Sequence, residues 1–270
     1  MPTTFERERP VAEEAEALLQ QLPDHVLDGL RQSIYEELKA ELGLSKRVRE
    51  IPRIESKLRR HILEMPKEIH AASGIVIWGR RIKSLVFTTD IAIIRNCNAD
   101  AVLAVYPFTP QQVISDAIIS SSYIPVFCGV GGGTTQGTRS VALAQDAEAL
   151  GAMGLVVNAP MSNEDIQAIY RCVDVPIVVT VFNEHTDIDA RLTAGSSILN
   201  VSAADRTPQV VAHIRTRYPD LPIIATGGPT TESISATIAA GANAISYTPP
   251  TPKDLFTSMM ANYRERESEK

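Results

Sequence analysis

Short apolar runs rich in Val and Ile recur along the chain from about residue 73 onward. There are eight of them, at residues 84–89, 101–106, 125–129, 154–159, 176–181, 197–202, 222–227 and 244–248. Their continuous apolar character is typical of strands buried on both faces, as in a parallel sheet. Segments of helical periodicity lie between most of the runs, and the first, near residues 91–98, must be very short. The pattern therefore predicts eight βα units.

Glycines mark several of the expected helix ends. Gly151, Gly195 and Gly241 each stand between a helical segment and the next apolar run, where a left-handed residue commonly ends a helix. Eight such units in about 190 residues favour an α/β fold of the (β/α)8 TIM-barrel type over an open doubly wound sheet. The stretch SGIVIWGRRIKSLVF, residues 73–87, additionally predicts a hairpin that closes the bottom of the barrel.

The chain before residue 73 has a different composition, charged and helical in pattern. One apolar stripe there has a three-to-four-residue spacing and consists of Val26, Leu27, Leu30, Ile34 and Leu38. We therefore divide the chain into a helical N-terminal extension, 1–72, the barrel, 73–265, and a charged tail, 266–270. The basic run at 46–60 is better interpreted as a solvated helix face or a subunit contact than as a patch for an anionic partner. We expect a homo-oligomer.

Composition narrows the class of function. The chain has 270 residues, a formal net charge of -6 and a pI of about 5.5, and this acidic balance argues against a nucleic-acid partner. No apolar run approaches the roughly 20 residues that span a bilayer, and the charged N-terminus does not resemble an export signal, so neither a membrane partner nor export is expected. The three cysteines, without a CxxC motif, suggest neither disulfides nor structural zinc. We expect a cytoplasmic protein with a small-molecule substrate and no cofactor.

Polar residues follow nearly every apolar run. In a TIM barrel the catalytic face is formed at the carboxyl ends of the strands, so these residues are candidates for a site. Among them are Asp90, Asn158, Asn183, Asn200, Thr226 and Thr248. Since a purely structural barrel would not need so many convergent polar groups, they predict a polar ligand at this end. In particular, Asn158, Asn183, Asn200 and Thr248 are candidate substrate-binding residues.

The loop after the third run is rich in glycine, with five glycines between residues 129 and 137. Glycines such as Gly131, Gly132 and Gly133 let backbone N–H groups approach an anion closely, and a helix beginning near Thr138 would present its positive end. Arg139 would add a bidentate contact to a phosphate or carboxylate. The alternative is a flexible lid that closes over substrate without binding an anion.

Acid–base candidates are few. Glu184 and His185 follow the fifth run and can act as a general acid or base, and Asp90 follows the first. Each has a structural alternative: Asp90 as the cap of the short first helix, and Thr186 or Asp187 as the cap of the helix after His185. Asp205 would either bind a substrate hydroxyl or cap the helix that begins near Thr207, and the cap is slightly favoured. No second histidine lies at ligand spacing, so no metal is expected.

Two further residue types bear on the chemistry. No lysine occurs between Ser84 and Pro252, whereas a Schiff-base aldolase needs one on a barrel strand. Imine chemistry is therefore disfavoured. Cys128 is interpreted as a packed strand residue, since nothing near it in the sequence indicates a thiol of depressed pKa.

The segment PIIATGGPTTESISATIAAGANAISY, residues 222–247, resembles the phosphate-binding (β/α)8 barrels, which include ribulose-phosphate epimerases and indole-glycerol-phosphate synthases. The resemblance implies that Gly227 and Gly228 offer backbone N–H groups to a phosphate. This chain departs from the pattern after the eighth run, SYTPPT, which has no glycine; the hydroxyls of Thr248 and Thr251 would substitute. Residues 50–264 also resemble a group of bacterial barrel proteins called hydrolases, through strings such as IPVFCGVGGGTTQG and SILNVS.

These observations lead to one favoured function and two alternatives. The favoured one is an isomerase, epimerase or lyase acting on a small phosphorylated or carboxylated metabolite. Glu184 or Asp90 would be the base and His185 the acid. The first alternative is a hydrolase in which a carboxylate activates water. The second is a non-catalytic ligand-binding or scaffold barrel.

Overall fold

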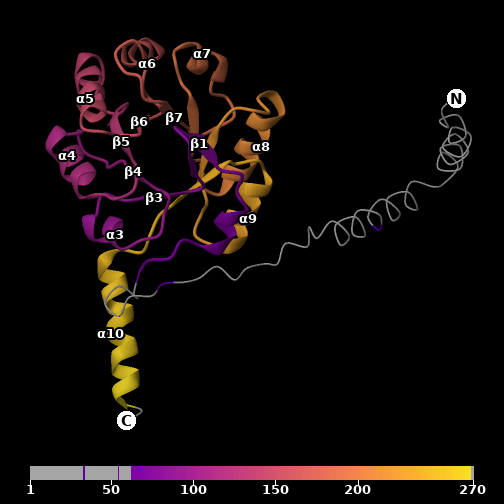
Figure 1. The fold of residues 1–270 in the computed structure, drawn as a ribbon. Helices are drawn as coiled ribbons and strands as arrows, with labels where there is room; N and C mark the ends of the chain where they lie inside the picture. The colour runs from indigo at the N-terminus through magenta and orange to yellow at the C-terminus, as the bar shows by residue number, and fades with distance from the viewer. Residues whose placement is uncertain (1–32, 34–53, 55–61, 269–270) are drawn as a thin grey trace, which may run out of the picture. The chain divides into compact units, whose positions relative to one another are not determined.

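A computed structural model of the chain describes Ser33, Ile54 and residues 62–268. Eight parallel strands form a closed barrel in the order β10-β3-β4-β5-β6-β7-β8-β9 (Figure 1). They are β3 (Ser84–Phe87), β4 (Ala101–Ala104), β5 (Val126–Gly131), β6 (Gly154–Val157), β7 (Ile177–Val181), β8 (Ile198–Val201), β9 (Ile223–Thr226) and β10 (Ala244–Tyr247). Each strand falls on one of the eight apolar runs, so the (β/α)8 prediction is confirmed.

Helices follow the strands and cover the outside of the barrel (Figure 1). They are α3 (Ile91–Arg95), α4 (Gln112–Ser121), α5 (Thr138–Ala149), α6 (Asn163–Tyr170), α7 (Ile188–Thr193), α8 (Thr207–Arg217), α9 (Thr231–Ala239) and α10 (Pro252–Ser268). The short first helix is confirmed as the five-residue α3. Gly151, Gly195 and Gly241 have φ values of 98°, 113° and 108°, which confirms them as left-handed helix ends.

Two apolar clusters form the core, because successive residues of a strand point to opposite faces. One cluster packs between strands and helices and includes Val86, Leu155 and Val179. The other fills the barrel interior with residues of opposite parity, such as Leu85 and Val178. This alternation assigns every strand residue either to the helix layer or to the interior, and it therefore decides which side chains reach a ligand inside the barrel.

A hairpin closes the amino-terminal end of the barrel, as the sequence predicts. Strands β1 (Ile75–Ile77) and β2 (Arg80–Ile82) pair antiparallel, and Ile75, Ile77 and Ile82 belong to the interior cluster. The hairpin is attached beside the start of β10, where the Gly74 N–H donates to the Asn243 carbonyl at 2.7 Å. The interior is therefore filled from this end.

The chain divides into two compact units, residues 1–55 and 56–270. The apolar stripe from Val26 to Leu38 and most of the basic run at 46–60 lie outside the described residues. Within the second unit, the η1 turn (Lys67–Ala71) packs on α9, and Leu63 bridges to Cys97 beside α3. The division at residue 72 and the charged tail stay predictions.

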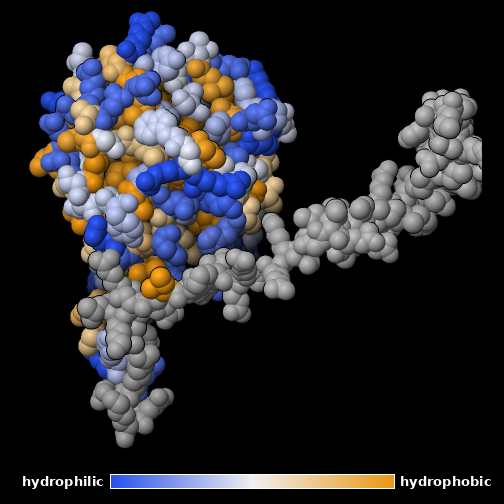
Figure 2. Space-filling model, in the orientation of Figure 1, coloured by the Kyte–Doolittle hydropathy of each residue, from blue (hydrophilic) through white to orange (hydrophobic). Residues whose placement is uncertain are grey.

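The surface of the barrel is mixed in character. Hydrophilic and hydrophobic residues are interspersed over the face shown in Figure 2. Within the part of the chain that the structure describes, no helix is both long and apolar enough to cross a lipid bilayer.

Candidate functional site

A row of polar side chains runs along the inner wall of the barrel near the carboxyl ends of three adjacent strands. Thr180 of β7 is the register partner of Asn200 of β8. Both lie two residues beyond an interior apolar residue, Val178 and Ile198, so both face the interior. Asn158, which directly follows β6, continues the row on the neighbouring strand.

Asn200 is the most buried member of this row, with 8% of its surface exposed. Its amide nitrogen donates to Thr180 Oγ1 at 3.3 Å, whereas its carbonyl oxygen Oδ1 is buried without a hydrogen-bond partner among the described residues. Buried polar atoms in folded proteins are nearly always paired, because an unpaired one loses its hydration without compensation. The open acceptor at Asn200 therefore marks a position for an external donor.

Two hydroxyl residues extend the polar wall on the other side of Asn200. Thr226 of β9 pairs in register with Ser246 of β10. Each lies two positions beyond an interior residue, Ile224 and Ala244 respectively, and so faces inward as well. Ser246 is 5% exposed, and Thr226 is half-buried at the mouth of the barrel. Five neighbouring strands, β6 to β10, thus present uncharged polar groups to the interior at their carboxyl ends.

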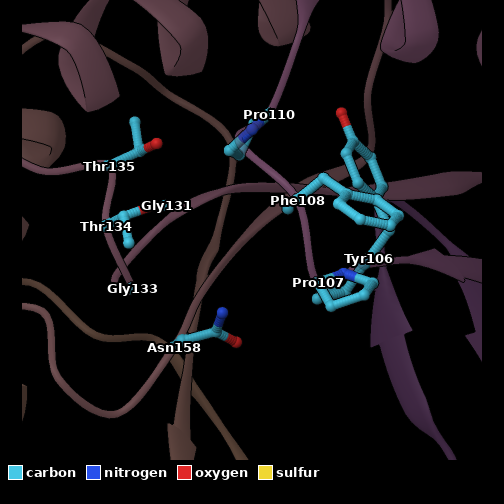
Figure 3. A pocket seen from close by; sticks show the side chains of 11 residues that line it. Tyr106, Pro107, Phe108, Pro110, Gly131, Gly133, Thr134, Thr135 and Asn158 are labelled. Carbon is cyan, nitrogen blue, oxygen red and sulfur yellow. The ribbon is translucent and has the colours of Figure 1, made fainter.

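A cavity of about 200 Å³ opens beside this wall (Figure 3). Its lining comes from the loop after β4, from the end of β5 and from Asn158 after β6. The residues are Val105, Tyr106, Pro107, Phe108, Pro110, Gly129, Gly131, Gly133, Thr134, Thr135 and Asn158. No Asp, Glu, His, Lys or Arg occurs among them, so this lining can bind a ligand through hydrogen bonds and apolar contacts but carries no ionised side chain.

The glycine-rich loop has two positions that only glycine fits. Gly131 and Gly132 have φ values of 144° and 102°, and a Cβ on Gly132 would lie 2.6 Å from backbone atoms of Asn158. A Cβ on Gly133 would meet nothing within 4 Å. The close approach to Asn158 explains Gly132 without reference to an anion, and contacts with Ser140 and Thr135 explain Gly131 in the same way; neither explains Gly133. The assignment of these three glycines to a phosphate stays a prediction.

The helix after this loop begins at Thr138, as predicted, and it has no side-chain cap of its own. Instead, the carboxylate of Asp165 accepts a hydrogen bond from Gly137 N–H at 3.0 Å. Arg139 is exposed in the first turn and forms no hydrogen bond or ion pair with any described residue. Arg139 is therefore free to contact an acidic ligand group at the rim, while Asp165 places a negative charge near the same helix end.

Arg191 of α7, which sequence analysis did not single out, supports the loop after Asn158. Its guanidinium donates to the carbonyl oxygens of Met161 at 2.5 Å and Ala159 at 2.8 Å, and to Asn163 Oδ1 at 2.9 Å. Burial lowers the pKa of Arg191 without leaving the group unpaired. Arg191 is a positioning residue for the segment that carries Asn158.

Gly227 and Gly228 have structural explanations. A Cβ on Gly227 would lie 2.7 Å from Ile245, and the Gly227 N–H already donates to the Ser246 carbonyl at 3.2 Å. Gly228 has a φ of 77°, which favours glycine. Moreover, Thr230 and Ser233 cap α9 reciprocally, which occupies two of the N–H groups that a phosphate would need. Phosphate binding at this pair stays a prediction.

Glu184 and His185 lie on the loop between β7 and α7. Glu184 forms an ion pair with Arg206. A hydrogen bond from its own backbone N–H, together with the charge of Arg206, lowers the pKa of the Glu184 carboxyl. His185 is exposed, and its backbone N–H donates to Asn183 Oδ1 at 3.0 Å. Glu184 is thus held as a carboxylate, and Asn183 orders the loop.

Of the three aspartates considered as helix caps, two cap a helix and one does not. Asp90 caps α3, with Oδ1 accepting from Ile93 N–H at 3.1 Å, and Asp187 caps α7 through Ala190 N–H at 3.0 Å. Asp205 was wrongly expected to cap the next helix: it lies in η2 (Ala204–Arg206), and α8 has no side-chain cap. Thr248 is exposed at the rim.

The cysteine thiols and the potential metal ligands provide no reactive centre among the described residues. Cys128 is 1% exposed, and burial raises its pKa to about 11, in agreement with a packed residue. Among the residues that the structure describes, no three His, Cys, Asp or Glu side chains group closely enough to hold a metal.

The structure therefore brings Asn158 and Asn200 together on one wall and leaves Asp90, Glu184 and His185 on loops above it. Sequence analysis missed Thr180 and Ser246. The alternation of side chains along a strand was the available signal, since each lies two residues beyond an apolar residue of an expected strand. The sequence does not show which of the two faces points inward before the register is known.

No family model and no curated protein matches the sequence. Solved structures do match at the level of the fold. Phosphoenolpyruvate phosphomutase from Streptomyces platensis subsp. rosaceus is 16% identical over 68% of this chain and 81% of its own, with a TM-score of 0.51. A proposed phosphonomutase from Burkholderia cenocepacia J2315 is 15% identical over 69% and 92%, with a TM-score of 0.50. A phosphonopyruvate hydrolase bound to oxalate and Mg²⁺ is 13% identical over 76% and 87%, with a TM-score of 0.50.

These structural neighbours are enzymes of mutase and hydrolase type, and they are only distantly related to this chain. At such low identity the likeness establishes the TIM-barrel fold and no specific chemistry.

Proposed function

We propose that this chain is an enzyme that binds a small polar metabolite at the carboxyl end of the barrel and converts it by acid–base chemistry. An isomerase, epimerase or lyase reaction would suit these residues. One observation carries the proposal: Asn200 Oδ1 is buried and unpaired on an interior wall shared with Asn158 and Thr180. An unpaired buried acceptor costs about 1–3 kcal/mol, a cost that a ligand donor would remove.

The proposed roles follow from position. Glu184 or Asp90 acts as base and His185 as acid, because all three follow strands at the end that carries the polar wall. Asn158, Asn183 and Asn200 hydrogen-bond the substrate.

An acidic group on the substrate would lie at the rim, where Arg139 and Thr248 are exposed. Of the two glycine clusters, Gly131–Gly133 is the better candidate for such a group. The N–H groups of Gly227 and Gly132 already donate to the carbonyls of Ser246 and Thr135, but Gly131 and Gly133 line the cavity.

A non-catalytic binding barrel is the second candidate, and a specific observation favours it. The 200 Å³ cavity is lined without any Asp, Glu, His, Lys or Arg. Catalysis in this cavity would therefore need a loop residue to reach into it, whereas binding alone would not.

Thermal unfolding of the full chain against paired metabolites, with and without their phosphate, tests the proposal. A ligand at 100 times its Kd adds about 2.7 kcal/mol to the unfolding free energy. Compounds that stabilise are then assayed for turnover with wild type, Glu184→Gln and Asp90→Asn. Turnover that survives both substitutions contradicts the acid–base assignment. Binding without turnover by wild type favours the binding barrel, and no stabilisation by any compound contradicts both.

A further inference from the structure

The inner wall near the strand ends carries no charge. One interior-facing position in or directly after each strand, taken around the barrel from β3, gives Phe87, Val105, Gly129, Asn158, Thr180, Asn200, Thr226 and Ser246. The first three are apolar or glycine, and the other five bear amides or hydroxyls. An anion held at this depth would lose hydration without meeting a cation, which is costly in a protein interior.

The hydrogen-bonding pattern of the wall is more specific than its lack of charge. In the orientation that the structure assigns to the Asn200 amide, one N–H donates to Thr180 Oγ1, and the carbonyl oxygen accepts from no described residue. Because Thr180 Oγ1 accepts that bond, the hydroxyl keeps its proton available for donation. An open acceptor and an open donor therefore lie side by side on adjacent strands.

A ligand hydroxyl both donates and accepts, so it can satisfy the two groups together. A carboxylate or phosphate only accepts, and would leave Asn200 Oδ1 unpaired. An ammonium only donates, and would leave the Thr180 hydroxyl without an acceptor. The hydroxyls of Thr226 and Ser246 on the next two strands can likewise pair with further hydroxyls.

We propose that the part of the ligand that enters the barrel interior is an uncharged, hydroxyl-rich group of the sugar or polyol class. This inference rests on the proposed function and narrows it: one ligand hydroxyl donates to Asn200 Oδ1 and accepts from Thr180 Oγ1. Any acidic group on the same ligand stays at the rim, on the side of Arg139.

The test measures dissociation constants for the full chain by ligand-observed NMR. Ribose, xylose and glucitol are the neutral probes, and inorganic phosphate and succinate are the anionic ones. The variants are Asn200→Leu, which replaces the amide with an apolar side chain of similar size, and Thr180→Val, which replaces the hydroxyl with a methyl group. Gln209→Leu is the matched control, since it makes the same type of change at an exposed position on α8. Circular dichroism checks that each variant folds.

We expect the neutral probes to bind wild type and Gln209→Leu alike, and to bind Asn200→Leu and Thr180→Val about tenfold more weakly or worse. Equal affinity in all variants would overturn the inference. Binding of the anionic probes alone, unaffected by Asn200→Leu, would overturn it and leave the proposed function standing. If no probe of either class bound, the inference would fail. If, in addition, no compound in the thermal-unfolding screen stabilised the protein, the proposed function would be contradicted as well.

Discussion

Gly132 lies against the backbone of Asn158, so that a Cβ on Gly132 would fall 2.6 Å from both the amide nitrogen and the carbonyl oxygen of Asn158. Backbone atoms cannot rotate away as a side chain can, and the φ of 102° at Gly132 also disfavours any other residue. We expect Gly132→Ala to lower the free energy of unfolding by about 1–3 kcal/mol. Urea denaturation measures this change.

Gly133→Ala is the matched control in the same loop. A Cβ at this position meets nothing within 4 Å, so we expect a change within about 0.5 kcal/mol. Similar losses from Gly132→Ala and Gly133→Ala would show that the loop does not adopt this conformation.

Replacing Arg191 tests how the segment after Asn158 is supported. The guanidinium donates to two carbonyls and to Asn163 Oδ1, and an ammonium cannot reproduce this fork. We expect Arg191→Lys to cost about 1–3 kcal/mol of unfolding free energy, because it leaves partly buried carbonyls unpaired. Arg171→Lys, at an exposed position after α6, should be nearly neutral. If Arg191→Lys left the unfolding free energy unchanged, the supporting role of Arg191 would be contradicted.

The two roles of Asp90 can be separated by two substitutions. Asp90→Asn keeps an oxygen that can accept from Ile93 N–H, whereas Asp90→Ala removes it. We expect Asp90→Ala to cost about 1 kcal/mol and Asp90→Asn much less, as for other N-caps. If Asp90 is only a cap, turnover follows stability in both variants. If it is a base, Asp90→Asn loses turnover while keeping stability.

The ion pair between Glu184 and Arg206 predicts a pH dependence. The pKa of Glu184 is lowered from 4.5 in the folded chain, so its stabilising contribution is present above pH 4.5 and is lost as pH falls through the lowered value. We expect the stability difference between wild type and Glu184→Gln to shrink over that acidic range. Added salt should reduce the part due to Arg206, because the guanidinium is largely exposed.

A double-mutant cycle with Arg206→Gln isolates the pair at neutral pH. Strict additivity of Glu184→Gln and Arg206→Gln would mean that the two side chains do not interact in solution.

The fold was predictable because local and global signals agree in this chain. Each apolar run is buried on both sides, and Gly151, Gly195 and Gly241 end helices through a conformation that glycine adopts freely. Caps such as Asp90 and Asp187 need only contacts within four residues, so sequence spacing reveals them. Asp205 shows the limit of that rule, since the same residue type at similar spacing caps nothing.

Only some residues of the candidate site could be predicted from the sequence. Asn158 and Asn200 stand out because amides are unusual at the ends of apolar strands. Thr180 does not, because threonine is an ordinary strand residue, and its inward direction follows only from the register with β8. Arg191 reaches carbonyls 30 and 32 residues away, and no local pattern records such a contact.

The hairpin of β1 and β2 has a kinetic consequence. Ile75, Ile77 and Ile82 fill the barrel from its amino-terminal side, so among the described residues the interior around Asn200 is closed at that end. Substrate would therefore enter, and product would leave, at the carboxyl end of the barrel. For any reaction on this wall, product inhibition competitive with substrate is the expected steady-state pattern.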